Sequence, residues 1–205
     1  MTNKIDSIEA LRKTYNMPMD ATKAKKLPCL EPHAIAFINI CPFLVISSSD
    51  GAGQADASPR GEGPGFVKVI DNNTIIIPDR PGNNLLDTLE NIIRNPSVGL
   101  LFMVPGMNET LRINGQAEIS IENDLLDLCL ERDKPPKSVI KVRVESSYMH
   151  CPKAFIRSKL WDADAQIDRS TFPTLGKIIK DQLKLDVPTM MIDASLDEDA
   201  KNNLF

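Results

Sequence analysis

A chain of 205 residues with 42% hydrophobic and 25% charged side chains is long enough to fold around a sizeable core without disulfides or metal. Its net charge of −4 and pI of about 5.3 exclude the broad basic surface that general nucleic-acid binding requires. The longest apolar runs, such as residues 98–104, are too short to span a membrane, and the charged N-terminus does not resemble a signal peptide. We therefore expect a cytoplasmic protein that binds neither nucleic acid nor membrane, while a local anion site remains compatible with the charge.

The first fifty residues predict short helices followed by one strand. Apolar side chains share one face at helical spacing over residues 5–14, which indicates a helix. Residues 17–32 read as an irregular segment, whose lysine cluster we interpret as solvated rather than as a binding patch. A helical turn is expected at residues 34–40 and a strand at residues 43–49. The lysine cluster consists of Lys23, Lys25 and Lys26.

The middle of the chain is rich in expected strands. Besides the strand at residues 43–49, they are residues 66–70, 74–77, 97–104, 110–121 and 139–147. The run at residues 97–104 is almost continuously apolar, so we expect it to be buried on both faces. Helices are expected over residues 83–94, with an asparagine as N-cap, and over about residues 123–131.

The short connections between these strands decide the fold class. A doubly wound parallel sheet needs a helix at nearly every crossover, whereas here one helix is inserted after the third strand. We therefore predict a mainly β fold with peripheral helices, built on a closed or nearly closed antiparallel barrel. The single domain would consist of a helical segment at residues 1–40, a barrel core at 41–150 and a helical tail at 151–205. The acidic stretch at residues 186–199 is expected to be a solvated helix or arm.

Two segments place an arginine among prolines and glycines, namely ASPRGEGPGF at residues 57–66 and IPDRPGNN at residues 77–84. We interpret both as stiff turns, because proline and glycine fix the backbone and allow a ligand to approach closely. The planar guanidinium groups of Arg60 and Arg80 suit a phosphate, which the N-terminus of the following helix would also favour. Additional neutral hydrogen bonds would come from Ser58, Asn83 and Asn84.

A structural role for both arginines is the alternative. Each would then pair with a nearby acid, Glu62 or Asp79, and the sequence leaves the two interpretations equally open. The glycine spacing in these segments matches neither the Walker pattern nor GxGxxG. The sequence therefore indicates either a phosphate site or two structural ion pairs.

The remaining reactive side chains give no strong catalytic signal. His150 and Cys151 are adjacent, and adjacent strand residues point to opposite faces, so a catalytic pair is disfavoured. Trp161, the single tryptophan, fits a core position and a ring near a ligand equally well. The four cysteines form no CxxC pair and the two histidines complete no zinc pattern, so we expect reduced thiols and no metal site.

Five stretches of the chain carry a family resemblance. They are ASPRG through FV at residues 57–67, IPDRPGNN at 77–84, NPSVGLLF at 95–102, TLRING at 110–115 and HCPKAFIRSKLW at 150–161. Together they resemble the pyridoxamine 5′-phosphate oxidase-like family of FMN-binding split barrels, over about residues 40–162. The last stretch is similar to a branch of that family that is not assigned to vitamin B6 metabolism.

The resemblance implies a six-stranded split barrel and a homodimer with one FMN at each of two sites between the subunits. The implied cofactor-binding residues come from two barrel segments, from a later strand and, for the last three, from the partner chain. They are Ser58, Arg60, Pro78, Asp79, Arg80, Asn83, Asn84, Thr110, Arg112, Lys153, Arg157 and Trp161.

The chain departs from the vitamin oxidase itself where that enzyme recognises its ligands. Where the oxidase carries an Arg-Lys pair after a serine, this chain has Pro81-Gly82-Asn83-Asn84. Residues 162–205 contain no counterpart of the oxidase's C-terminal arginine–histidine motif. We therefore do not expect pyridoxamine phosphate to be the substrate.

The resemblance implies an FMN-dependent oxidoreductase that transfers a hydride between the flavin and a small-molecule substrate. No substrate acid or base is identified and no catalytic residue is assigned, so a non-catalytic flavin-binding or flavin-sensing protein is the alternative. A different cofactor, such as haem or a deazaflavin, is a third interpretation, with His150 as a ligand if the cofactor is haem.

Overall fold

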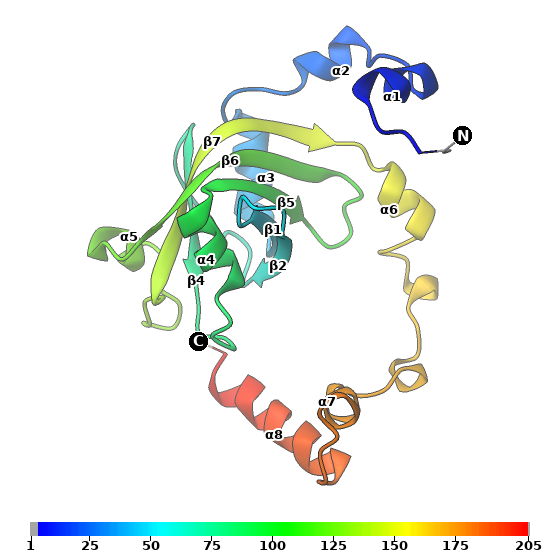
Figure 1. The fold of residues 1–205 in the computed structure, drawn as a ribbon. Coiled ribbons are helices and arrows are strands. Elements are labelled where there is room, and N and C mark those ends of the chain that lie inside the picture. Colours follow the sequence, from blue (N-terminus) through cyan, green and yellow to red (C-terminus); the bar gives the residue numbers. More distant parts are fainter. Residues whose placement is uncertain (1–3, 205) are drawn as a thin grey trace.

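The computed structural model describes residues 4–204, which fold around one strongly curved antiparallel sheet (Figure 1). The sheet has seven strands in the order β2-β1-β5-β6-β7-β4-β3, and each neighbouring pair is antiparallel. The strands are β1 (Phe43–Ser49), β2 (Ala55–Gly61), β3 (Lys68–Asp71), β4 (Thr74–Asp79), β5 (Ser97–Met103), β6 (Thr110–Ser120) and β7 (Ser138–His150). The predicted mainly β fold with peripheral helices is confirmed.

The strand count and the closure of the sheet differ from the prediction. The sheet has seven strands rather than six, and its order ends at two edge strands, β2 and β3. Over residues 4–204 the sheet is therefore open rather than closed. We call this curved sheet the barrel.

The additional strand is β2, which contains the first of the two arginine segments. The prediction of a stiff turn around Arg60 is wrong, because Ser58 pairs with Ile46 and Arg60 pairs with Leu44 of β1. A proline at position 59 is compatible with this strand because β2 lies at the edge of the sheet, where a ladder N–H is dispensable. The strand escaped prediction because its side chains alternate between exposed and half-buried, so it has no apolar face.

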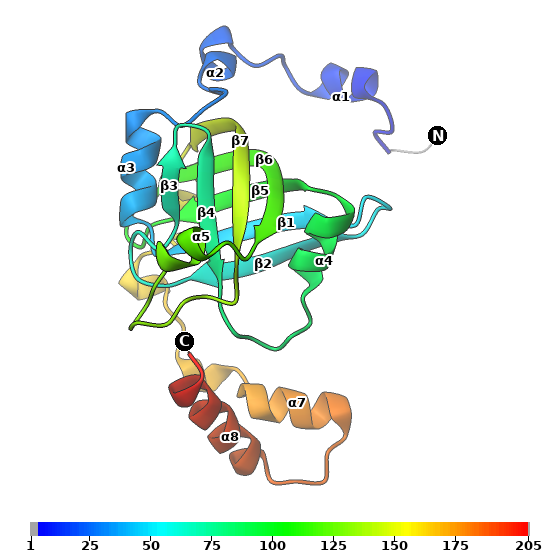
Figure 2. The same ribbon diagram turned by 90° about the vertical axis from the view of Figure 1, so that its left-hand side faces the viewer.

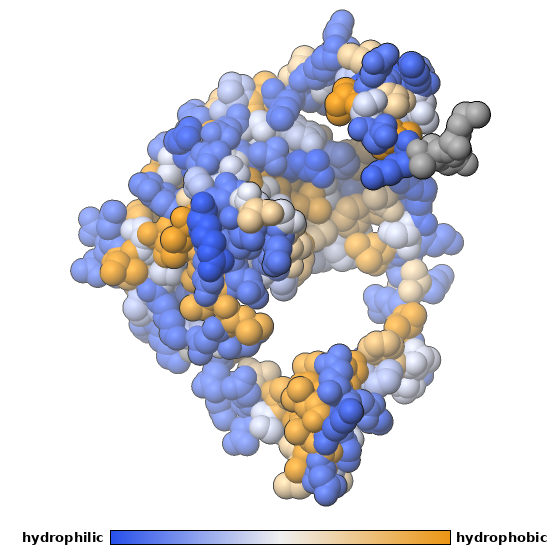
Figure 3. Space-filling model, in the orientation of Figure 1, coloured by the Kyte–Doolittle hydropathy of each residue, from blue (hydrophilic) through white to orange (hydrophobic). Residues whose placement is uncertain are grey.

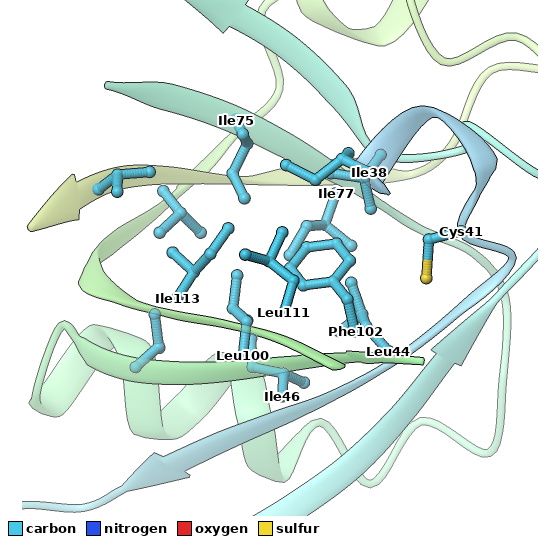
Figure 4. Packing of buried hydrophobic residues seen from close by; sticks show 14 of the residues in the cluster. Ile38, Cys41, Leu44, Ile46, Ile75, Ile77, Leu100, Phe102, Leu111 and Ile113 are labelled. Carbon is cyan, nitrogen blue, oxygen red and sulfur yellow. The ribbon is translucent and has the colours of Figure 1, made fainter. Parts of the chain in front are cut away.

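Apolar side chains from both halves of the barrel meet inside it (Figure 4). Those of β1, β5 and β6 point toward those of β4 and of helix α3 (Pro32–Ile40). The residues labelled in Figure 4 are at most 1% exposed, and they are Ile38, Cys41, Leu44, Ile46, Ile75, Ile77, Leu100, Phe102, Leu111 and Ile113. Full burial of one such large side chain stabilises a fold by about 1.5–3 kcal/mol. The barrel is therefore held together mainly by this core.

Strand β5 is buried on one face only, contrary to the prediction. Val98, Leu100 and Phe102 are buried in the core, whereas Leu101 and Met103 are only half-buried on the other face. On this outer face Leu101 lies in register between Val45 of β1 and Arg112 of β6. The side chains of β5 on the outer face are apolar as well, so the sequence of β5 resembles that of a strand buried on both faces. In the single chain, this outer face is nevertheless partly exposed to solvent.

Short helices surround the barrel and form both ends of the chain. They are α1 (Ile8–Thr14), α2 (Asp20–Ala24), α3, α4 (Asp87–Arg94), α5 (Asn123–Asp127), α6 (Lys153–Ser158), α7 (Leu175–Leu183) and α8 (Thr189–Asn202). Two 3-10 turns, Ala163–Ala165 and Arg169–Thr171, connect α6 to α7. The helices predicted at residues 5–14, 83–94 and 123–131 are present but shorter, and α2 was not expected. No helix within residues 4–204 is long and apolar enough to cross a membrane.

The N-cap of α4 also differs from the prediction. We expected an asparagine, but the N-cap is Leu86, which has a left-handed backbone (φ 61°) and makes no side-chain cap hydrogen bond. Helix α4 is fixed instead by its buried side chains. Asn91 donates to Ser48 Oγ at 3.1 Å, and Ile92 enters the core. Tertiary packing therefore decides where this helix begins.

Candidate functional site

A cleft of about 820 Å3 opens at the end of the barrel between β2, the end of β4 and the N-terminus of α4. Figure 2 shows β2 and the long connection from β4 to α4 at this same end of the molecule. Seven of the residues predicted to bind a cofactor line the cleft, namely Ser58, Arg60, Pro78, Asp79, Arg80, Asn83 and Asn84. The structure thus brings together the two arginine segments, which lie about twenty positions apart in the sequence.

Arg60 reaches into the cleft from β2 and leaves part of its guanidinium group unsatisfied. Its NH1 donates to the carbonyl of Pro59 at 2.9 Å, and its NH2 lies 3.6 Å from Asp79 Oδ1. Its Nε is buried and has no hydrogen-bond partner within the described chain. Buried donors are almost always paired, so this nitrogen indicates a group that the polypeptide of one chain does not supply.

Arg80 is fully engaged by the protein. Its Nε and NH2 form a bidentate pair with Glu62 at 2.8 and 3.0 Å. The same guanidinium donates to the carbonyl of Cys129 at 2.7 Å and to that of Lys134 at 3.2 Å. The ion pair that the sequence left open as an alternative is therefore present for Arg80, and it ties three segments of the cleft wall together.

Asp79 is a half-buried carboxyl group between the two arginines. Burial raises its pKa above the ordinary value, while the positive charges of Arg60 and Lys137 oppose this shift. The backbone carbonyl of Asp79 also accepts a hydrogen bond from the N–H of Lys137 at 3.2 Å. A carboxylate with this environment tolerates a nearby neutral group better than a second anion.

The connection from β4 to α4 has two residues in a backbone conformation that is unusual for their type. Asn84 has φ 58° and Leu86 has φ 61°, which places both in the left-handed region. A strained backbone conformation persists only where the surrounding structure fixes it, and such conformations are frequent in ligand-binding segments. Here the side chain of Thr88 fixes the far end of the connection by donating to Asp56 Oδ2 at 3.1 Å.

The N-terminus of α4 faces the cleft without a side-chain cap. Residues 86–89 line the cleft, and the Leu86 N-cap leaves the first N–H groups of the helix available. These N–H groups and the helix dipole favour an anion, whereas the carboxylate of Asp87 in the first turn opposes it. Combined with Arg60, the cleft offers charge-assisted and backbone donors for one phosphate-sized group.

The remaining predicted site residues lie away from this cleft in the same chain. Thr110 is buried in β6, and Arg112 is exposed on the outer face of the sheet, where its NH1 donates to Tyr148 Oη at 3.0 Å. Trp161 donates from Nε1 to the carbonyl of Met107 at 2.7 Å and stacks on Phe155. Lys153 and Arg157 are exposed on α6.

The cleft also includes residues that the sequence did not suggest as ligands. Glu62 was considered only as an ion-pair partner, while Glu131, Arg132, Lys137 and Leu204 were not considered. Leu204 is the last described residue of the chain, and no pattern in the sequence around it predicts that it lies in the cleft. Glu131, Arg132 and Lys137 lie in the loop after α5. Arg80 holds this loop by donating hydrogen bonds to the carbonyls of Cys129 and Lys134.

The cysteines and histidines form no second site within the described part of the chain. All four cysteines are free thiols, and burial raises the pKa of Cys41 and Cys129. Among residues 4–204 there is no group of three or more histidine, cysteine or acidic side chains that could hold a metal ion. The cleft is therefore the candidate functional site.

Comparison with known proteins shows the family to which the chain belongs. A family model described as pyridoxamine 5′-phosphate oxidase matches residues 30–151, which include the barrel and most of the cleft. The chain belongs to the pyridoxamine 5′-phosphate oxidase family. No curated protein matches the chain.

Solved structures to which this chain is similar carry different names. HupZ of Group A Streptococcus has 21% identity and a TM-score of 0.48 over 58% of this chain and 93% of that chain. A putative pyridoxamine 5′-phosphate oxidase from Lactobacillus delbrueckii has 20% identity and a TM-score of 0.46 over 60% and 98% of the two chains. An FMN-binding protein from Syntrophomonas wolfei has 11% identity and a TM-score of 0.45 over 58% and 82%.

The first prediction concerns the ion pair in the cleft wall. Glu62→Gln should lower the free energy of unfolding by about 3 kcal/mol, because it leaves the buried charge of Arg80 without its partner. Urea unfolding of the ligand-free protein measures this loss. Glu118→Gln is the matched control, since the Glu118–Lys141 pair is exposed and should be worth less than about 1 kcal/mol. Equal losses in the two variants would show that the Glu62–Arg80 pair is not structural.

The second prediction concerns the pH dependence that Asp79 imposes on the ligand-free fold. Because its pKa is higher in the folded state than in the unfolded chain, folding favours the protonated carboxyl, and this favourable contribution is lost as the pH rises through both values. Asp79→Asn removes that loss. The variant should therefore gain stability relative to the wild type as the pH is raised from about 3.5 to about 7, a range that begins near the ordinary pKa of an aspartate and extends above it. Urea unfolding at several pH values tests this, and a difference that shrinks with rising pH would contradict it.

Proposed function

We propose that the chain binds FMN in the cleft and acts as a flavin-dependent oxidoreductase on a small molecule. The observation that supports this most directly is the buried, unpaired Nε of Arg60 in a cleft that the uncapped N-terminus of α4 also lines. An arginine donor and helix N–H groups together are suited to a phosphate. Membership of the family agrees with a flavin as the bearer of that phosphate.

The size and lining of the cleft fit a flavin nucleotide. Its volume of about 820 Å3 lies within the range of roughly 300–1,000 Å3 that small-molecule sites occupy. Arg60 and the N–H groups of residues 87–89 would hold the phosphate, and the side chains of Ser58, Asn83 and Asn84 would offer neutral hydrogen bonds to the sugar chain. FMN would supply the hydride chemistry when bound, because none of these side chains can carry a hydride.

The two arginines would have different roles at this site. Arg60 would contact the ligand, since its guanidinium has an unused donor. Arg80 would position the wall, since Glu62 and two carbonyl groups already occupy it. The Arg60–Asp79 pair at 3.6 Å is loose enough for Arg60 to turn toward a phosphate without losing a strong bond.

A homodimer would complete the site. Arg112, Lys153, Arg157 and Trp161 carry the family resemblance but lie outside the cleft of their own chain. The outer face of the sheet between them and β1 includes the half-buried Val45, Leu101 and Met103. Such an apolar face with a charged border is typical of an interface between copies. A second copy on this face would bring its own Arg112 and α6 toward this cleft.

The third prediction tests the phosphate contact. Arg60→Met keeps the length of the side chain but removes its donors, and it should weaken FMN binding about 10- to 100-fold, the equivalent of one charge-assisted hydrogen bond of roughly 1.5–3 kcal/mol. Fluorescence titration of the ligand-free protein with FMN measures the affinity. Arg143→Met is the matched control, because Arg143 is an exposed arginine on β7 outside the cleft. FMN affinity that is unchanged in Arg60→Met would overturn the phosphate role.

The same titrated protein distinguishes an enzyme from a flavin-binding protein. Reduced nicotinamide, with oxygen or an artificial electron acceptor present, should be consumed in many turnovers per bound FMN if the protein is an oxidoreductase. Consumption of at most one equivalent would support the non-catalytic alternative, in which the protein only binds or senses the flavin.

The fourth prediction tests the dimer. Leu101→Arg places a charge in the centre of the outer face, so it should convert the dimer into a monomer and weaken FMN binding together with it. Size-exclusion chromatography with light scattering gives the mass. Ile121→Arg is the control, because Ile121 is an exposed apolar residue beyond the end of β6. A Leu101→Arg protein that is monomeric and still binds FMN like the wild type would show that one chain forms the whole site.

A further inference from the structure

Two segments of the chain stand away from the barrel at its opposite ends. We call residues 4–26 the N-terminal arm and residues 172–204 the C-terminal hairpin. In Figures 1 and 2 the arm lies above the barrel and the hairpin below it. Within the described chain, the hydrogen bonds of the arm join its own residues, and those of the hairpin do the same apart from the bonds of Phe172 and Pro173 with Arg169, which lies just before the hairpin.

The N-terminal arm has an apolar face that its own chain does not cover. Ile8 is 74% exposed and Met19 is 75% exposed, although α1 has an ordered serine cap at its N-terminus. The arm is anchored at its end, where Leu27 exchanges two backbone hydrogen bonds with Ser147 of β7. It is therefore a short helical extension whose apolar face needs a partner.

The two helices of the C-terminal hairpin are joined by hydrogen bonds, but the apolar side chains on its surface are as exposed as those of the arm. Asp193 of α8 accepts hydrogen bonds from Thr174 Oγ1 at 2.8 Å and from the N–H of Gly176 at 2.9 Å. A side chain at position 176 would collide with Asp193, so the glycine permits the close contact between α7 and α8. Even so, Met190 and Met191 of α8 remain exposed, and Figure 3 shows apolar side chains on the surface of the hairpin.

The two segments have opposite charge. The N-terminal arm has six cationic and three anionic side chains, which gives it a net charge of +3. The C-terminal hairpin has six anionic and four cationic side chains, a net charge of −2, and its helix α8 alone has four anionic side chains and one cationic side chain, a net charge of −3. The lysine cluster at the end of the arm and the run Asp197-Glu198-Asp199 on α8 account for most of this contrast. Apolar faces bordered by opposite charges attract and orient one another.

We propose that the N-terminal arm of one copy lies on the C-terminal hairpin of a second copy. This inference rests on the homodimer proposed above. The two segments of one chain are separated by the barrel, so their contact is between copies. A two-fold axis would form the contact twice, once at each end of the dimer. Because Leu204 at the end of the hairpin lines the cleft, the arm of one copy would hold the C-terminus of the other at that copy's cleft.

Isotope-resolved cross-linking tests the contact directly. Unlabelled and 15N-labelled full-length chains are mixed, unfolded and refolded together, and then treated with a carbodiimide that joins touching amines and carboxylates. Cross-links of Lys23, Lys25 or Lys26 with Asp197, Glu198 or Asp199 should join a labelled to an unlabelled peptide in about half of the cases, the statistical share for contacts between copies in a two-fold pair. Cross-links confined to peptides of one label would mean that the segments meet within one chain, and their absence from a dimeric sample would mean that they do not meet. Either result overturns the proposal.

Charge reversal gives an independent measurement. Changing the three lysines of the cluster to glutamate should weaken the dimer about tenfold at low salt, and reversing Asp197, Glu198 and Asp199 to lysine in the same chain should restore the affinity. Glu122→Lys, Asp124→Lys and Asp127→Lys at α5 form the matched control and should leave the affinity unchanged. A cluster variant that dimerises like the wild type, or a double reversal that does not recover, would contradict the arm contact.

The outcomes separate this inference from the proposed function. FMN affinity and the mass of the Leu101→Arg variant report on the cleft and the outer face of the sheet. A dimer that binds FMN but yields no arm–hairpin cross-links would retain the proposed function and reject the contact between the arms. A chain that is monomeric at all concentrations tested would reject the homodimer and the arm contact together, while its FMN affinity would still decide the proposed function of the cleft.

Discussion

The bidentate pair between Arg80 and Glu62 is the interaction on which the shape of the cleft depends. It joins the end of β4 to the segment that follows β2, and the carbonyl bonds of Arg80 add the loop after α5. Both side chains are largely withdrawn from water, so the pair is costly to break from one side. Without it, three walls of the cleft would have no common attachment.

The strained connection between β4 and α4 is held between two such attachments. Arg80 fixes its beginning, and the Thr88–Asp56 hydrogen bond fixes its end against β2. Ser58 of β2 donates to the same carboxylate at 2.9 Å, so one acid organises the strand and the helix together. The left-handed residues between these anchors are thereby kept in place, and the buried Nε of Arg60 has no hydrogen-bond partner within residues 4–204.

The sequence predicted the fold where burial leaves a regular pattern and failed where it does not. Strands β1, β4, β6 and β7 alternate or are continuously apolar, and each was found within a few residues of its position. Strand β2 has polar side chains, a proline and an edge position, so no local pattern distinguishes it from a turn. The two arginine segments that line the cleft were singled out in the sequence. The choice of Glu62 as the partner of Arg80 and the presence of Lys137 and Leu204 in the cleft depend on contacts between distant parts of the chain.

The proline in β2 has a consequence for the association of newly made chains. An exposed edge strand can pair with a strand of another molecule and begin aggregation. Pro59 stands in the middle of β2 and supplies no N–H, so the ladder on this edge is interrupted next to Arg60. The same short segment thus contributes an arginine to the cleft and protects newly made chains from pairing with one another.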